Sequence, residues 1–189
     1  MRMREKIMVL LIFLGFFILL VQPLQAVDPS PYPRDSFACE SFGVQRFQVK
    51  KEAPSFVLKD LKGNQVALSD FKGKPLLIFF WGSYCSACKE DIVLLKNFFE
   101  GKKDQLEILT IVIDGEKEKR VRRVMEENKI NLPILLDSKE KLARIYGVRM
   151  IPSAFFVNRE GLLEGMVVGQ RDWCRPHALS AVKELLDLR

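Results

Sequence analysis

The chain has 189 residues, of which 48% are apolar and 29% are charged, and this length is enough for one domain with a substantial core. Its formal net charge of +6 is spread out, and the most basic run, residues 117–123, is interleaved with glutamates in a pattern typical of a solvated amphipathic helix. Nucleic-acid binding requires an unopposed basic patch, so we expect no nucleic-acid partner.

Residues 1–26 have the pattern of a targeting segment, with a basic start, an unbroken apolar stretch at 7–21 and a small residue, Ala26, at the end. This pattern predicts a secretory signal peptide that is cleaved after Ala26. The apolar stretch is shorter than the roughly 20 residues that span a bilayer, but flanking residues can extend it. An N-terminal membrane anchor through residues 7–21 is therefore the alternative. In both cases we expect a periplasmic or other extracytoplasmic protein, secreted across or anchored to the inner membrane.

Residues 27–52 are predicted to form a separate segment, a Pro-rich linker followed by an extension. Prolines alternate with other residues over 28–35, which blocks helix formation and favours a stiff, extended chain. The extension contains Cys39 and one predicted strand at 44–49. We therefore expect the main domain to span residues 53–189.

The main domain begins with two short predicted strands, at 56–58 and 65–68, which a tight turn joins as a β-hairpin. Residues 76–81 are apolar and aromatic throughout, which is typical of a buried strand. A Gly-Ser pair ends this strand, and a Cys-x-x-Cys motif follows it directly. Apolar residues then recur at helical spacing, so the two cysteines lie where a strand ends and a helix begins.

In the rest of the chain, predicted strands alternate with predicted helices. Alternation of this kind predicts crossover connections and a parallel sheet with helices on both faces. The predicted elements are a strand at 107–114, a helix at 116–128, a strand at 132–136, a short helix ending at Tyr146, strands at 153–157 and 162–169, and a terminal helix over about 171–188.

The position of the Cys-x-x-Cys motif predicts redox chemistry. A helix N-terminus carries a partial positive charge and unpaired N–H groups, so we expect the pKa of Cys85 to lie below its usual value and Cys85 to be the nucleophile. Cys88 follows one helical turn later, deeper in the fold, and suits the resolving role in disulfide exchange. A structural zinc site would need a second pair of ligands at matching spacing, which the sequence lacks. We expect no metal and no cofactor.

Two further cysteines, Cys39 and Cys174, lie outside this motif. In an oxidising compartment we expect them to form a structural disulfide, which would close a loop of more than 130 residues and stabilise the fold by about 4–5 kcal/mol. Two buried, unbonded thiols are the alternative.

Three separate stretches, residues 53–74, 81–88 and 147–161, together resemble the thioredoxin fold, and more narrowly the TlpA, ResA and CcmG type of thiol-disulfide oxidoreductase. The second stretch is Trp-Gly-Ser-Tyr-Cys-Ser-Ala-Cys, and the third contains Met-Ile-Pro-Ser. The resemblance implies an α/β thioredoxin fold, in which helices flank a central mixed sheet and an N-terminal β-hairpin forms an extension.

The same resemblance implies which residues surround the cysteines. Pro152 would be the cis-proline of this fold, next to Cys85 and Cys88, and the backbone of Ile151 would pair with a substrate strand. Trp81 would pack beneath the site. Tyr84 replaces the tryptophan that is common before the nucleophile and keeps an aromatic wall with a polar tip. These four residues are the predicted substrate-binding group.

A proton acceptor for the second cysteine is also implied. Phe79 occupies the position at which thioredoxins keep a buried aspartate. In the ResA-like branch an acid three residues after the second cysteine is a candidate for this task, and here that residue is Asp91. The alternative is that Asp91 is merely a favourable acid near the start of a helix. Its neighbour Glu90 should face solvent.

The resemblance implies the reduction of selected extracytoplasmic protein disulfides, for example in apocytochrome c or a copper-site protein. The partners would be protein disulfides or dithiols and a membrane electron donor of the DsbD or CcdA type. A disulfide-forming oxidant is one alternative, and a copper-binding chaperone that uses the two cysteines and His177 without redox turnover is another. Peroxidase chemistry is disfavoured, because Gly82 and Ile78 stand where the peroxiredoxin pattern has threonine and proline.

Overall fold

A computed structural model of the protein describes residues 37–188. The predicted signal peptide or anchor, residues 1–26, and the Pro-rich part of the linker lie outside the described residues. No helix within residues 37–188 combines the length and the apolar character needed to cross a membrane.

Eight strands form a single sheet in the order β1-β8-β7-β4-β5-β6-β2-β3. The strands are β1 Gln45–Glu52, β2 Val57–Asp60, β3 Gln65–Ala67, β4 Leu76–Trp81, β5 Glu107–Val112, β6 Ile134–Leu136, β7 Ser153–Val157 and β8 Leu162–Val168. The α-helices are α2 Phe37–Phe42, α3 Ser86–Phe99, α4 Glu118–Glu127, α5 Lys141–Ile145 and α6 Pro176–Leu186, and the 3-10 helices are η1 Leu68–Phe71, η2 Gly115–Lys117 and η3 Ser138–Glu140.

The sheet is mixed, as the family resemblance implied. Strand β4 pairs parallel with β5, which pairs parallel with β6. On its other side β4 pairs antiparallel with β7, which continues antiparallel into β8. The purely parallel sheet that alternation suggested is therefore confined to β4, β5 and β6. Strands β7 and β8 form a hairpin, and a hairpin can only be antiparallel.

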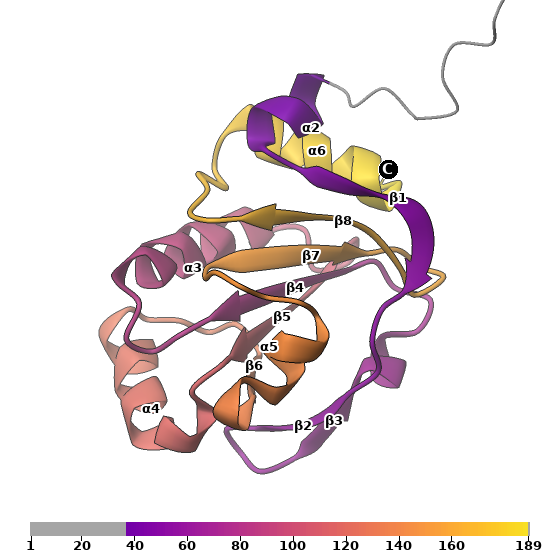
Figure 1. Cartoon of the computed structure of the whole chain (residues 1–189). Coiled ribbons are helices and arrows are strands. Elements are labelled where there is room, and N and C mark those ends of the chain that lie inside the picture. Colours follow the sequence, from indigo (N-terminus) through magenta and orange to yellow (C-terminus); the bar gives the residue numbers. More distant parts are fainter. Residues whose placement is uncertain (1–36, 189) are drawn as a thin grey trace, which may run out of the picture. The chain divides into compact units, whose positions relative to one another are not determined.

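Strand β4 lies inside the sheet, between β7 and β5, and every one of its six residues is buried. Successive side chains of a strand point to opposite faces, so β4 supplies both cores. Leu77, Phe79 and Trp81 pack with α2, α3, α4 and α6, whereas Leu76, Ile78 and Phe80 pack with α5 and the segment before β2. Figure 1 shows α5 in front of the sheet, with α3 at the end of β4.

The N-terminal part of the described chain differs from the sequence-based expectation. The strand predicted at 44–49 is β1, and it pairs with β8 as an edge of the main sheet. A short helix, α2, precedes it and packs against α6 (Figure 1). Only Cys39 and Phe42 of α2 are buried, which is too short an apolar pattern to predict a helix from the sequence. Residues 37–52 are therefore part of the sheet and its cover, not a separate extension.

The predicted β-hairpin is present as β2 and β3, and the pairing of β2 with β6 joins it to the far edge of the sheet. The terminal helix is shorter than expected, because α6 begins at Pro176 and not near Arg171. Proline suits the first position of a helix, where its missing N–H costs nothing. The residues before it form a loop, 169–175, that passes along α3 and contributes to the site described below.

Candidate active site

Cys85 and Cys88 form a disulfide at the point where β4 has ended and α3 begins. Cys85 is the N-cap residue of α3, and its sulfur accepts a hydrogen bond from the backbone N–H of Cys88 at 3.1 Å. Cys85 is partly exposed, whereas the side chain of Cys88 is 0% exposed. An external thiol can therefore reach the sulfur of Cys85 and not that of Cys88, which is the arrangement expected for an attacking and a resolving cysteine.

The loop that leads into Cys85 is held by Asp114, at the end of β5. The backbone N–H and the hydroxyl of Ser83 donate to the two oxygens of the Asp114 carboxylate, at 2.9 and 2.6 Å. Both residues are buried. The sequence-based predictions gave this pair no role. The signal was present, because β4 and β5 are adjacent buried strands and the carboxyl ends of parallel strands meet at one edge of a sheet.

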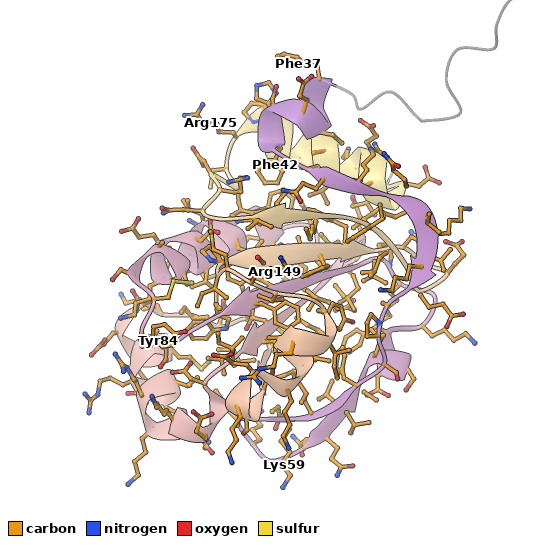
Figure 2. All side chains as sticks on the ribbon, viewed as in Figure 1. Phe37, Phe42, Lys59, Tyr84, Arg149 and Arg175 are labelled. Carbon is orange, nitrogen blue, oxygen red and sulfur yellow. A yellow bond between two sulfur atoms is a disulfide. The ribbon has the colours of Figure 1, made fainter. Side chains whose placement is uncertain are left out.

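Gly82 allows two side chains to meet beside the disulfide. A Cβ atom on Gly82 would lie 2.9 Å from the Tyr84 ring and 3.0 Å from Cδ1 of Ile151, closer than real Cβ contacts. Tyr84 is 50% exposed, and Figure 2 shows it at the surface beyond the end of β4. Desolvation is the largest cause that raises the pKa of the Tyr84 hydroxyl, and the negative charges of Asp114 and Glu140 add to the rise. Tyr84 and Ile151 thus both approach Gly82, just before the redox-active cysteines.

The peptide bond between Ile151 and Pro152 is cis, which confirms the expectation from the family resemblance. The carbonyl of Pro152 accepts a hydrogen bond from the N–H of Gly169 at 2.8 Å. By contrast, neither the N–H nor the carbonyl of Ile151 takes part in a hydrogen bond with any of residues 37–188. Unpaired backbone groups beside a disulfide can pair with an extended polypeptide.

Trp81 does not have the substrate contact that we predicted. Its side chain is 0% exposed and packs in the same core cluster as Cys88. It is the last residue of β4, a strand covered on both faces, so a substrate cannot touch it in this structure. The expectation that Trp81 packs beneath the site agrees with this placement.

Asp91 is 1% exposed and lies one turn after Cys88 on the buried face of α3. One carboxyl oxygen accepts the backbone N–H of Arg171 at 3.1 Å. Burial raises the pKa of Asp91 to about 7, and the nearby charge of Asp172 adds to the rise. The Arg171 N–H, the indole of Trp173 and the Arg171 charge act in the opposite direction. A buried acid beside Cys88 can therefore take up or release a proton near neutral pH.

Glu90, the neighbour of Asp91, is exposed as expected, and it accepts a hydrogen bond from Gln170 at 2.8 Å. Phe79 is buried and apolar, so it supplies no proton acceptor beneath the disulfide. Asp91 is therefore the acid that α3 places on the side of Cys88.

The other two cysteines lie against different elements. Cys39 is buried in α2, where the guanidinium of Arg46 approaches its sulfur at 3.5 Å. Cys174 is an exposed, free cysteine in the loop 169–175, and its sulfur lies 4.0 Å from the carbonyl of Leu94 on α3. The disulfide that we predicted between Cys39 and Cys174 is therefore not formed in this structure, which has Cys85–Cys88 as the disulfide among residues 37–188.

His177 lies in the first turn of α6, where its ring packs edge-on against Phe37 at 5.5 Å between centroids. It does not join the two active-site cysteines: within residues 37–188, no three side chains of the His, Cys, Asp and Glu types gather as a metal site would require. The three-ligand copper arrangement is therefore not assembled in the described part of the chain.

Comparisons with known proteins agree with this geometry. The model of the AhpC/TSA family matches residues 49–166. The thiol-disulfide oxidoreductase ResA of Bacillus subtilis is 33% identical over 128 residues, which cover 67% of this chain and 71% of that protein.

Solved structures add the same fold. The exposed lipoprotein thioredoxin of Streptococcus pneumoniae is 31% identical with a TM-score of 0.61, covering 69% of this chain and 99% of that one. StoA of Bacillus subtilis is 27% identical with a TM-score of 0.55, covering 62% of this chain and 89% of that one. The chain is thus similar to a protein named as a thiol-disulfide oxidoreductase and shares its fold with a protein named as a thioredoxin.

Proposed function

The chain belongs to the AhpC/TSA family and is a thiol-disulfide oxidoreductase of the ResA and StoA type, and from this premise we propose that it reduces protein disulfides outside the cytoplasm. One observation carries the proposal. The partly exposed sulfur of Cys85 caps a helix and is bonded to the fully buried sulfur of Cys88, beside the unused backbone groups of Ile151. Such a site accepts a polypeptide disulfide and resolves the intermediate from within.

The reaction starts from the reduced pair. The Cys85 thiolate, favoured by the N-terminus of α3, attacks one sulfur of the partner disulfide. A bond forms between the two proteins, and the partner's other sulfur leaves with the electron pair and takes up a proton. Cys88 then loses its proton and attacks the sulfur of Cys85, which releases the partner's second thiolate. Two electrons pass to the partner, and the Cys85–Cys88 disulfide remains.

Asp91 supplies the proton acceptor that Cys88 needs. The two residues lie one turn apart on the same buried face of α3. Because Cys88 is 0% exposed, its thiol has no direct contact with water and needs an acceptor from the protein. A carboxylate with a pKa of about 7 is matched to a task at neutral pH, because a much stronger acid would not hold the proton. Asp91 therefore acts as general base while the mixed disulfide is resolved.

Partner recognition involves the segment around the cis-proline. The N–H and carbonyl of Ile151 pair with an extended segment next to the partner's cysteine. Tyr84 and Met150, both exposed, contact the side chains that flank that cysteine. Because backbone pairing is independent of side chains, we expect selection among partners to depend on the contacts of Tyr84 and Met150.

The extracytoplasmic location is supported by the pattern of residues 1–26 and by the similarity to an exposed lipoprotein of Streptococcus pneumoniae. A protein that reduces disulfides there must itself receive two electrons after each turnover. A membrane electron donor of the DsbD or CcdA type fits this need, and the disulfides of apocytochrome c or of a copper-site protein fit the acceptor side.

The deciding experiment is the equilibrium reduction potential of the Cys85–Cys88 pair, measured by thiol trapping and intact mass in graded thiol buffers. A reductant should show a two-electron transition near or below about −250 mV. A value near −120 mV would instead identify a disulfide-forming oxidant. If no reversible transition occurred, metal binding by the two cysteines would replace the redox proposal.

A further inference from the structure

The carboxyl of Asp91 is enclosed by the loop 169–175, which joins β8 to α6. Arg171 donates its backbone N–H to one carboxyl oxygen at 3.1 Å. The preceding residue, Gln170, donates to Glu90 at 2.8 Å, so the loop is attached to α3 at two successive residues. The protonation of Asp91 therefore depends on a segment 80 residues away in the sequence.

Trp173 belongs to this loop and is 1% exposed. Its indole N–H and the second carboxyl oxygen of Asp91 are both buried, and neither has a hydrogen-bond partner of normal geometry among the described residues. The indole acts to lower the pKa of Asp91. Trp173 follows two residues after Arg171, whose N–H donates to Asp91, so its donor-only indole is an available partner for the unpaired carboxyl oxygen.

Helix α2 contacts both Trp173 and the side chain of Arg171. The ring of Phe42 packs edge-on against Trp173, with 5.1 Å between centroids and an interplanar angle of 74°. The carbonyl of Phe42 accepts a hydrogen bond from Nε of Arg171 at 2.9 Å. Phe98 of α3 packs on Trp173 as well, at 5.9 Å. Figure 2 shows Phe42 at the end of α2, above the sheet.

We propose that Trp173 is a positioning residue for proton transfer at Cys88: its indole N–H and the backbone N–H of Arg171 hold the Asp91 carboxylate, and α2 holds both donors. The inference rests on the proposed role of Asp91 as general base. The indole N–H can donate but not accept, so it stabilises the ionised carboxyl, which is the form that can take a proton from Cys88. The charged groups that face Asp91 are Arg171, which favours ionisation, and Asp172, which opposes it.

The test is a titration of the Asp91 carboxyl carbon by NMR in the full oxidised protein, with the signal assigned by its loss in Asp91→Asn. Trp173→Phe keeps an aromatic ring against Phe42 and removes the N–H. We expect the pKa of Asp91 to rise by about one pH unit, because the ionised carboxyl loses the stabilisation that the indole N–H provides.

Trp81→Phe is the matched control, because Trp81 is equally buried in the same core cluster and its indole N–H also lacks a partner among the described residues. Asp91 should titrate in this variant as in the wild type. The inference is overturned if Trp173→Phe leaves the pKa unchanged or lowers it, or if both tryptophan variants raise it equally.

Phe42→Leu provides a second variant, since it keeps an apolar side chain and removes the edge-on ring contact with Trp173. A smaller rise in the pKa of Asp91 is expected, and an unchanged titration would refute the role of α2. Failure of the proposed function has a different signature. If Asp91→Asn left the lifetime of the mixed disulfide unchanged, Asp91 would not be the general base, whatever the titrations showed.

Discussion

Cys85 and Cys88 share one bond, yet their surroundings are built in different ways. On the outer side Cys85 and Ile151 are partly exposed and Tyr84 is half exposed, and Tyr84 and Ile151 both approach the buried Gly82, an arrangement that we call the outer rim. On the inner side Cys88, Asp91 and Trp173 are all buried, with Cys88 and Asp91 one turn apart on α3 and Cys88 and Trp173 in the same core cluster. Attack requires access to a partner, whereas resolution requires a proton acceptor that the partner does not provide. Each sulfur therefore has the environment that its step needs.

The largest expected effect separates the two sulfurs. Cys85→Ser should abolish disulfide exchange, because no other exposed thiol among residues 37–188 caps α3. Cys88→Ser should still attack but should accumulate a mixed disulfide with the partner, which gel electrophoresis without reductant would detect. Cys174→Ser is the control and should turn over normally. Trapping by Cys85→Ser in place of Cys88→Ser would reverse the assignment of the two sulfurs.

Stability should report the burial of Asp91. Its pKa is about 7 in the folded protein and about 3.9 when unfolded, so the folded state binds the extra proton between these values. The free energy of unfolding should therefore fall as pH rises from about 4 to 7, by on the order of 4 kcal/mol. Urea denaturation across this range measures the slope, and Asp91→Asn should flatten it. An equal slope in both proteins would show that Asp91 titrates normally.

The attack of Cys88 on the mixed disulfide should slow when Asp91 is removed. We expect Asp91→Asn to lengthen the lifetime of the mixed disulfide by about 100-fold at neutral pH, which is typical of the loss of a general base. Attack by Cys85 should be unaffected, since Asp91 lies on the side of Cys88. Quenched-flow thiol trapping resolves the two steps, with Glu90→Gln as the neighbouring control. A slower first step would mean that the inner side also serves Cys85.

The smallest effect concerns the outer rim. Gly82→Ala places a methyl group within 3.0 Å of Tyr84 and Ile151, so these two side chains must shift. Overpacking of this kind costs about 1 kcal/mol, and we expect a roughly fivefold rise in KM for a protein disulfide with little change in the pKa of Asp91. Tyr84→Phe, which keeps the ring, should change KM less. A change in Asp91 titration would instead show that the two regions are coupled.

The features of the site differ in how far the sequence could predict them. The redox pair, its place between a strand and a helix, and the hairpin came from patterns within a few residues. The cis bond before Pro152 and the candidate role of Asp91 came from the family resemblance. The structure has the cis bond and places Asp91 one turn after Cys88 on the buried face of α3. Trp81 was assigned to the substrate because it is near the motif in sequence, whereas the sheet buries it completely.

Amino-acid sequence alone determined the chemistry of this protein, because a strand, a turn and a helix start are local structures that place Cys85 and Cys88 without distant contacts. Tertiary structure decided how that chemistry is supported. Ser83 meets Asp114 across 31 residues, Asp91 meets Arg171 across 80, and Arg171 meets Phe42 across 129. Such contacts depend on which strands and loops become neighbours in the folded chain, and no local periodicity carries that information.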